Sequence, residues 1–220
     1  RAIAQKFPDD GILSEETEDT PLRLGKTRVW VVDPLDGTKE FVKYLQHPEE
    51  HPYFAVHIGL AIGGVPYVGA VTQPIGERTY YAQKGHGAFV EERGTKQRLH
   101  VSNTASLSYA SIGIASPEKQ NVIALAQELG IDKVLYQEST GLRICSVAAG
   151  STDCTINING NTKEWDICAP HVILEEAGGK ISAARTLLLY NQPDVAIKSV
   201  LATNRHLHGQ MDETIRIILG

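Results

Sequence analysis

The stretch VVDPLDGTKEF, residues 31–41, joins an apolar strand to a predicted helix and carries two carboxylates three positions apart. Proline donates no hydrogen bond to a sheet, so Pro34 is expected to end the strand and to leave Asp33 at its carboxyl end. A tight turn then brings Asp36 toward the same point, with the Leu35 carbonyl between the two acids. Oxygens that converge in this way suit Mg²⁺, which prefers oxygen ligands in octahedral geometry.

The residues that follow favour an anion. Gly37 has no side chain to block the approach of a ligand, and Thr38 is expected to cap a helix that begins at Lys39. The first N–H groups of a helix are unpaired and its dipole is positive there, so this end suits phosphate. Asp-Pro and Asp-Gly are also common turn dipeptides, and threonine is a common cap, so an ordinary turn remains an alternative for this stretch alone.

Two further segments add acids. Residues 11–16 (GILSEE) are typical of a short strand that ends in paired acids, and Glu15 can supply a bridging carboxylate to the same metals. A solvated acidic turn is the alternative. Asp166 follows Trp165 at the start of a predicted helix that ends at two glycines, residues 178–179, and a simple N-cap is the alternative there.

Composition limits the function classes. A formal net charge of -5 argues against a protein that binds a nucleic acid polymer or an anionic membrane, although small anions remain possible ligands. The three cysteines form no CxxC pair, so we expect neither a disulfide framework nor a zinc site. No apolar run approaches the roughly 20 residues of a membrane span, and we expect a cytoplasmic protein. Residues 1–7 resemble the last turns of a helix, so we expect further residues upstream.

The first half of the chain predicts an antiparallel meander, and the second half predicts alternating strands and helices. Expected strands of the first half cover residues 53–62, 65–72, 78–83 and 88–91, with one helix at 39–45. The second half should have strands near 109–115, 133–138, 153–158, 180–183 and 199–202, and helices at 116–130, 142–149, 167–177 and 205–219. We therefore predict a mixed α+β or α/β protein, with a sheet-rich metal- and phosphate-binding part at 1–105 and an α/β part at 106–220 that completes the active site.

Five segments together resemble a known superfamily in their order and spacing. They are SEE (14–16), WVVDPLDGT (30–38), GHGAF (85–89), EWDICAPHVILEEAGG (164–179) and SVLATN (199–204). The chain resembles the lithium-sensitive, Mg²⁺-dependent phosphatases, which include inositol monophosphatases, fructose bisphosphatases and 3'(2'),5'-bisphosphate nucleotidases. DGTKEF is similar to the bacterial nucleotidase branch of CysQ type, whereas inositol monophosphatases usually show DGTTNF and fructose bisphosphatases DGSSN. The resemblance implies a layered αβαβα sandwich with the site between the two halves.

The resemblance also implies roles for particular residues. The implied ligands of two or three Mg²⁺ ions are Glu15, Asp33, the Leu35 carbonyl, Asp36 and Asp166. Gly37 and Thr38 would hold phosphate oxygens, and the Thr38 hydroxyl would orient the attacking water with Glu15 as a neighbouring acceptor. Asp36 is expected to be essential for catalysis. In the nucleotidase branch this threonine pairs with an aspartate of an N-terminal helical hairpin, a segment that this sequence does not contain, so we assign no residue to that role.

The resemblance implies hydrolysis of a phosphomonoester by a metal-activated water, without a phosphoenzyme. Our first choice of substrate is 3'-phosphoadenosine 5'-phosphate, and inositol 1-phosphate or another sugar phosphate is the alternative. Nucleotidases of this branch carry a Ser-x-x-Lys pair and a later arginine. Thr140 and Arg143 would replace the pair and contact substrate beside Asp166, but Ile158 stands where the arginine is expected.

Two other classes are weighed against this one. A non-catalytic metal- and phosphate-binding module would not require all the implied ligands. A haloacid dehalogenase-type phosphatase has one residue between its two acids, whereas two residues separate Asp33 from Asp36. We expect a monomer or a homodimer that binds a small phosphorylated substrate.

Overall fold

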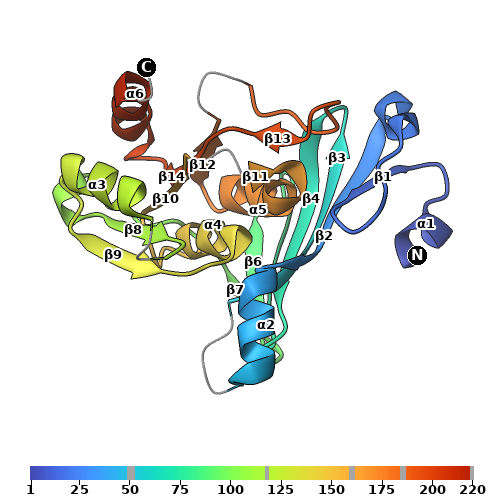
Figure 1. Ribbon diagram of the computed structural model, residues 1–220, viewed down its shortest axis with the longest axis horizontal. Helices are drawn as coiled ribbons and strands as arrows, with labels where there is room; N and C mark the ends of the chain where they lie inside the picture. Colours follow the sequence, from blue (N-terminus) through green and yellow to red (C-terminus); the bar gives the residue numbers. More distant parts are fainter. Residues whose placement is uncertain (49–52, 117–118, 159–161, 184–186, 219–220) are drawn as a thin grey trace.

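The computed structural model describes residues 1–48, 53–116, 119–158, 162–183 and 187–218 (Figure 1). Within these residues the chain forms two large sheets and several helices, which is the mixed arrangement that the sequence predicts. None of the helices in these ranges combines the length and the hydropathy needed to cross a bilayer.

The first half of the chain forms a seven-stranded sheet whose strands lie in sequence order. The strands are β1 (Gly11–Ser14), β2 (Arg28–Asp36), β3 (Ala55–Ile62), β4 (Val65–Gln73), β5 (Arg78–Gln83), β6 (Ala88–Glu92) and β7 (Thr95–Arg98). β1 pairs with β2 in parallel, and every later pair is antiparallel. The predicted meander is confirmed. β7 is not among the predicted strands, because its sequence TKQR has no apolar alternation.

The second half forms a five-stranded sheet in the order β12-β14-β10-β8-β9. Its strands are β8 (Ser111–Ile114), β9 (Lys133–Tyr136), β10 (Cys154–Asn157), β12 (Gly179–Ser182) and β14 (Val200–Asn204), and β11 (Thr162–Lys163) pairs with β13 (Ala196–Ile197) in a small ribbon. The helices are α1 (Ala2–Lys6), α2 (Thr38–Gln46), α3 (Gln120–Glu128), α4 (Thr140–Ala148), α5 (Glu164–Glu176) and α6 (His208–Ile218), with 3-10 turns η1 (Pro21–Gly25) and η2 (Leu107–Tyr109).

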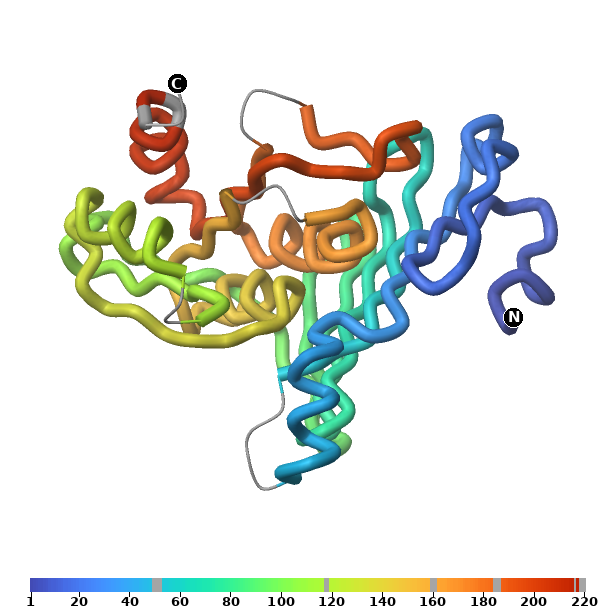
Figure 2. Tube along the Cα trace, in the orientation of Figure 1, coloured from blue at the N-terminus to red at the C-terminus, as the bar shows by residue number. Residues whose placement is uncertain are grey.

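Helices α4 and α5 lie between the two sheets, and α3 and α6 cover the outer face of the five-stranded sheet (Figures 1 and 2). One hydrophobic cluster joins α4 and α5 to both sheets, and a second joins α3 and α6 to β8 and β10. The described residues thus supply four of the five layers of the predicted sandwich. We propose the division into 1–105 and 106–220 because each part holds one sheet, while the first cluster joins the parts into one core.

Two paired glycines allow α5 to approach the sheet closely. Gly59 and Gly69 face each other across β3 and β4. A Cβ atom on Gly59 would lie 2.7 Å from Cys168 Sγ, and one on Gly69 would lie 2.2 Å from the carbonyl oxygen of Ala169. The small residues of β3 therefore face the helix, and the large apolar residues at its even positions lie on the opposite side of the sheet.

Glu176 links two segments that lie far apart in the sequence. Its carboxylate accepts hydrogen bonds from the backbone N–H of Gly85 at 2.7 Å and of Gly87 at 2.6 Å. Both glycines have positive φ, of 81° and 82°, which favours glycine. The motifs GHGAF and EEAGG therefore depend on each other, and this contact explains an acid at the unfavourable end of a helix dipole.

Helix starts differ from the prediction for local reasons. α4 begins at Thr140 rather than at residue 142, because the Ser139 side chain caps it by accepting from the backbone N–H of the third residue of the helix. Ser116 is the predicted N-cap of α3, whereas the helix begins at Gln120 with Lys119 as its N-cap. The predicted Pro-Glu start of α3, residues 117–118, lies outside the described residues.

Candidate active site

A bulge in β2 places Asp33 and Asp36 on the same side. In a regular strand, residues three apart point to opposite faces. Here Asp33 pairs with His57 and Asp36 pairs with Ala55, so three steps along β2 match two steps along β3. The irregular step contains Pro34, which has no N–H to donate. The prediction that the strand ends at this proline is wrong: a bulge, and not a tight turn, brings the two carboxylates together.

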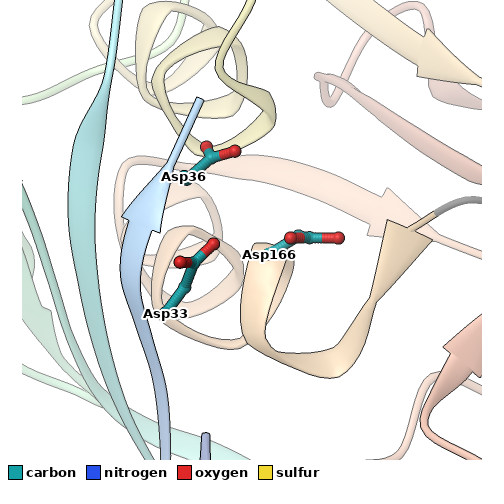
Figure 3. Close-up of side chains that lie close together, drawn as sticks. All are labelled: Asp33, Asp36 and Asp166. Atoms are coloured by element: carbon teal, nitrogen blue, oxygen red, sulfur yellow. The ribbon is translucent and has the colours of Figure 1, made fainter. Parts of the chain in front are cut away.

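Asp166 completes a cluster of three acids. It lies in the first turn of α5, where its Oδ2 accepts a hydrogen bond from the backbone N–H of Lys163 at 2.6 Å. One oxygen from each of Asp33, Asp36 and Asp166 lies within 4.8 Å of the others, and Figure 3 shows the three side chains close together, two on β2 and one at the start of α5. Three carboxylate oxygens this close together could hold one divalent cation.

The acids of the cluster make one another harder to ionise. Asp33 is 1% exposed, and burial together with the neighbouring Asp36 raises the pKa of Asp33 to about 8. Burial and Asp36 also raise the pKa of Asp166 to about 7. Glu15 contributes to both shifts through its charge. A divalent cation would neutralise this repulsion, which fits a metal site better than a set of structural caps.

The hydrogen bonds around the cluster leave oxygens for a cation. Asp33 Oδ1 accepts from the backbone N–H of Leu35 at 2.8 Å, whereas Asp33 Oδ2 is buried and has no hydrogen-bond partner among the residues that the structure describes. Asp36 Oδ2 accepts from the Ser139 hydroxyl and, at 3.1 Å, from the backbone N–H of Gly141. An unpartnered buried carboxylate oxygen is costly unless a proton or a metal ion pairs with it. This all-oxygen donor set fits Mg²⁺.

Glu15 lies at the rim of the cluster. It directly follows β1, it is exposed, and its backbone N–H donates to the Val32 carbonyl at 3.3 Å. Its carboxylate is not among the three oxygens that lie within 4.8 Å of one another. The structure thus brings three of the four predicted acids together and leaves the fourth within electrostatic reach.

Gly37 and Thr38 lie at the start of α2, but not in the predicted manner. Gly37 is the N-cap, with φ of 89°, and a Cβ atom there would lie 2.7 Å from the Tyr53 carbonyl oxygen. Backbone conformation and packing therefore require this glycine, in addition to any ligand. Thr38 is the first helical residue, and its hydroxyl donates to the Leu35 carbonyl at 3.2 Å instead of capping the helix.

A cavity of about 250 Å³ opens beside the cluster. Its lining is Asp36, Ile114, Ala115, Lys119, Val122, Glu138, Thr140, Arg143, Ile156, Asn157, Thr162 and Asp166. Arg143 is buried, and its Nη1 donates to the carbonyls of Gln137 and Glu138 at 2.8 and 2.5 Å. Its Nη2 donates to Thr140 Oγ1 at 3.1 Å. Most donors of the guanidinium are therefore already used to hold the turn that leads into α4.

A model of the inositol monophosphatase family matches residues 1–218. The chain belongs to the inositol monophosphatase family. It is 35% identical over 188 residues to a histidinol-phosphatase of Mycobacterium tuberculosis, covering 83% of this chain and 68% of that protein. It is 34% identical over 228 residues to an inositol-1-monophosphatase of Caulobacter vibrioides, covering 97% and 81%. The structure of staphylococcal SaIMPase-II with inositol monophosphate bound matches with a TM-score of 0.77 and 30% identity, covering 96% of this chain and 78% of that one.

Inositol monophosphatase family proteins are metal-dependent phosphatases that use Mg²⁺ and act on small phosphorylated molecules. The predicted fold class and the predicted phosphatase activity are confirmed at this level. The two relatives above are named for inositol phosphate and histidinol phosphate, and SaIMPase-II also matches in a structure with 2'AMP bound, with a TM-score of 0.79 and 29% identity.

Sequence reasoning missed three residues near the cluster. Ser139 both caps α4 and donates to Asp36, and a serine before an apolar helical run is a signal that could have identified it. Glu138 lines the cavity. His57 is buried on β3 with its Nε2 3.3 Å from Asp36 Oδ2. No local pattern predicts the last two, because their positions depend on how α4 packs against the seven-stranded sheet.

Proposed function

We propose that the chain hydrolyses a small phosphomonoester with the help of Mg²⁺, and that inositol monophosphate is the first candidate substrate. The observation that carries this proposal is the cluster of Asp33, Asp36 and Asp166, with its unpartnered buried oxygen, at the edge of a cavity. The cavity of about 250 Å³ beside the cluster gives a small phosphorylated molecule a place to bind.

Each part of the site has a proposed role. The three clustered acids would hold the cation, with the Leu35 carbonyl and Glu15 as further oxygen donors for two or three ions. When bound, Mg²⁺ polarises the phosphate ester and makes a water molecule more nucleophilic. Gly37 and Thr38 would bind phosphate oxygens at the amino end of α2, where N–H groups lack helical partners.

The chemical step needs no covalent enzyme intermediate. A water molecule would attack phosphorus in line while the bond from phosphorus to the ester oxygen breaks, and the departing alcohol would take up a proton. The Thr38 oxygen keeps a lone pair after it donates to the Leu35 carbonyl, so it can accept a hydrogen bond from that water. Glu15 would orient the same water from the rim.

A bisphosphate nucleotide receives less support as the substrate. A second phosphate calls for a cation; Arg143 already donates to two carbonyls and a hydroxyl, so this role would fall to Lys119, which also lines the cavity. Ile158, at the place of the expected arginine, offers no hydrogen bond. Thr140 remains a proposed contact to a substrate hydroxyl, because it lines the cavity.

Histidinol phosphate is a second candidate, and Glu138 is the observation that favours it. Glu138 lines the cavity with its carboxylate partly buried, and burial and the nearby Glu40 raise its pKa. An acid in this place would form an ion pair with the amine of an amino alcohol phosphate, whereas a neutral polyol would offer it hydroxyl hydrogen bonds without the ion pair.

The test is phosphate release with Mg²⁺ from inositol 1-phosphate, histidinol phosphate, 3'-phosphoadenosine 5'-phosphate and fructose 1,6-bisphosphate, each repeated with Li⁺. We expect turnover of one of the first two, inhibition by Li⁺, and less than about 1% of that rate in Asp36→Asn. Asp132→Asn is the matched control, because Asp132 is exposed and outside the cluster. Full activity of Asp36→Asn would refute the proposal. Silence on all four substrates by a protein that binds Mg²⁺ would favour a non-catalytic binding module.

A further inference from the structure

His57 is a fully buried histidine beside the acidic cluster. It lies on β3 directly opposite Asp33 in the sheet register, and its side chain is 0% exposed. The ring packs against the first turn of α4, where a Cβ atom on Gly141 would lie 2.3 Å from both Cε1 and Nε2 of the ring. The glycine at this position thus leaves the space that the imidazole occupies, and the packing fixes the direction of the ring.

The ring nitrogen Nε2 points at one oxygen of the cluster. It lies 3.3 Å from Oδ2 of Asp36, the oxygen that also accepts hydrogen bonds from the Ser139 hydroxyl and from the backbone N–H of Gly141. Among the described residues, neither ring nitrogen has a hydrogen bond of standard geometry. The Asp36 carboxylate is the acceptor within reach of Nε2, and the Trp165 carbonyl is a second acceptor beside the imidazole. A proton on Nε2 would attract the carboxylate, whereas a lone pair there would repel it.

We propose that His57 is a positioning residue: its Nε2–H acts with the start of α4 to hold Oδ2 of Asp36, so that Oδ1 turns toward the other two acids. A metal ligand whose second oxygen is held by neighbouring donors keeps its orientation without the cation, which raises the affinity of the site. The inference rests on the proposed function, because it assumes that the three acids bind a divalent cation.

The experiment measures Mn²⁺ binding by the loss of the free-ion electron paramagnetic resonance signal, without substrate, in wild type, His57→Leu and His57→Gln. We expect the leucine variant to bind Mn²⁺ about 10- to 100-fold more weakly, since loss of such a partner usually has this effect. Glutamine can place an N–H near the position of Nε2, so His57→Gln should stay within about threefold of wild type. Thermal unfolding in a chelator reports any change in stability separately.

A matched control separates positioning from packing. His208 is also a buried histidine, and its Nδ1 contacts Thr203 Oγ1 at 3.0 Å in the other sheet. His208→Leu should lower the unfolding temperature and leave the Mn²⁺ affinity unchanged. Unchanged affinity in His57→Leu, or equal losses in the leucine and glutamine variants of His57, would overturn the inference.

The wild-type protein provides a readout that does not depend on the variants. Long-range ¹H–¹⁵N spectra of labelled histidine identify the protonated ring nitrogen, and a proton on Nε2 of His57 is expected. A proton on Nδ1 alone would overturn the inference even if His57→Leu fails to fold. If the wild type does not bind Mn²⁺, both the proposed function and this inference are refuted. If the wild type binds Mn²⁺ and His57→Leu binds it with the same affinity, only the inference is refuted.

Discussion

Replacing Gly69 by alanine should loosen the packing of α5 on the seven-stranded sheet and weaken the metal site at the same time. The new Cβ atom would lie 2.2 Å from the carbonyl oxygen of Ala169 and 2.6 Å from a methyl carbon of Val172. Ordinary contact begins near 3.4 Å, so the helix or the strand must shift by roughly 1 Å. Because both obstacles belong to the helix that carries Asp166, the shift also changes the spacing of the cluster.

The expected cost follows from the depth of the clash. Overpacking a core usually costs 1 to 3 kcal/mol, and a clash with backbone belongs at the upper end, so we expect about 3 kcal/mol. For a chain of this size that loss lowers the unfolding temperature by about 6 to 12 °C. Thermal unfolding in a chelator measures the stability, and Mn²⁺ titration measures the affinity.

The control is the same substitution at Gly209, near the start of α6. No atom of the described residues lies within 4 Å of a Cβ atom at that position, and the glycine has no positive φ. Alanine favours a helix over glycine, so Gly209→Ala should stabilise the protein by about 0.5 kcal/mol and leave Mn²⁺ binding unchanged. An unfolding temperature of Gly69→Ala within about 2 °C of wild type would refute the packing argument.

Two further predictions concern protons and the Glu176 contact. Without metal, burial and neighbouring carboxylates raise the pKa of Asp33 to about 8 and of Asp166 to about 7, so the folded state holds protons that the unfolded chain has lost. The free energy of unfolding of the metal-free protein should therefore fall as the pH rises from about 4 to about 8. Calorimetry of Mg²⁺ binding in buffers of different ionisation enthalpy should show roughly two protons released per site at pH 6 and almost none at pH 9. Equal proton release at both pH values would contradict the raised pKa values. Glu176→Ala removes two hydrogen bonds to backbone N–H groups, so urea unfolding should show a free energy of unfolding lower by about 2 kcal/mol. Amide hydrogen exchange at residues 85–87 should become faster. Exchange at the wild-type rate would show that the contact does not hold this turn.

The elements of the fold could be predicted because most of them have local signals. The alternation of residues 53–62 and the glycines of the hairpin that follows predict paired strands, and β3 and β4 have that arrangement. Ser139 shows the limit of such signals: its role as a cap is local, whereas its hydrogen bond to Asp36 spans 103 residues.

The geometry of the candidate site could be predicted only in part. The acids at 33 and 36 were evident from the sequence, but the bulge that turns them to one side depends on how β2 pairs with β3. His57 gives no signal, because its position in an alternating strand matches many exposed residues, and only the approach of α4 buries it beside Asp36. Arg143 is predicted to contact substrate, yet its guanidinium is engaged by carbonyl groups that no local pattern identifies.

The central claim is that Asp33, Asp36 and Asp166 together bind a divalent cation. The most direct measurement is an anomalous difference map from crystals of the protein soaked in Mn²⁺. We expect a strong peak between the three carboxylates, within about 2.0 to 2.4 Å of one oxygen from each. A map in which Mn²⁺ binds elsewhere and leaves this cluster without a peak would contradict it.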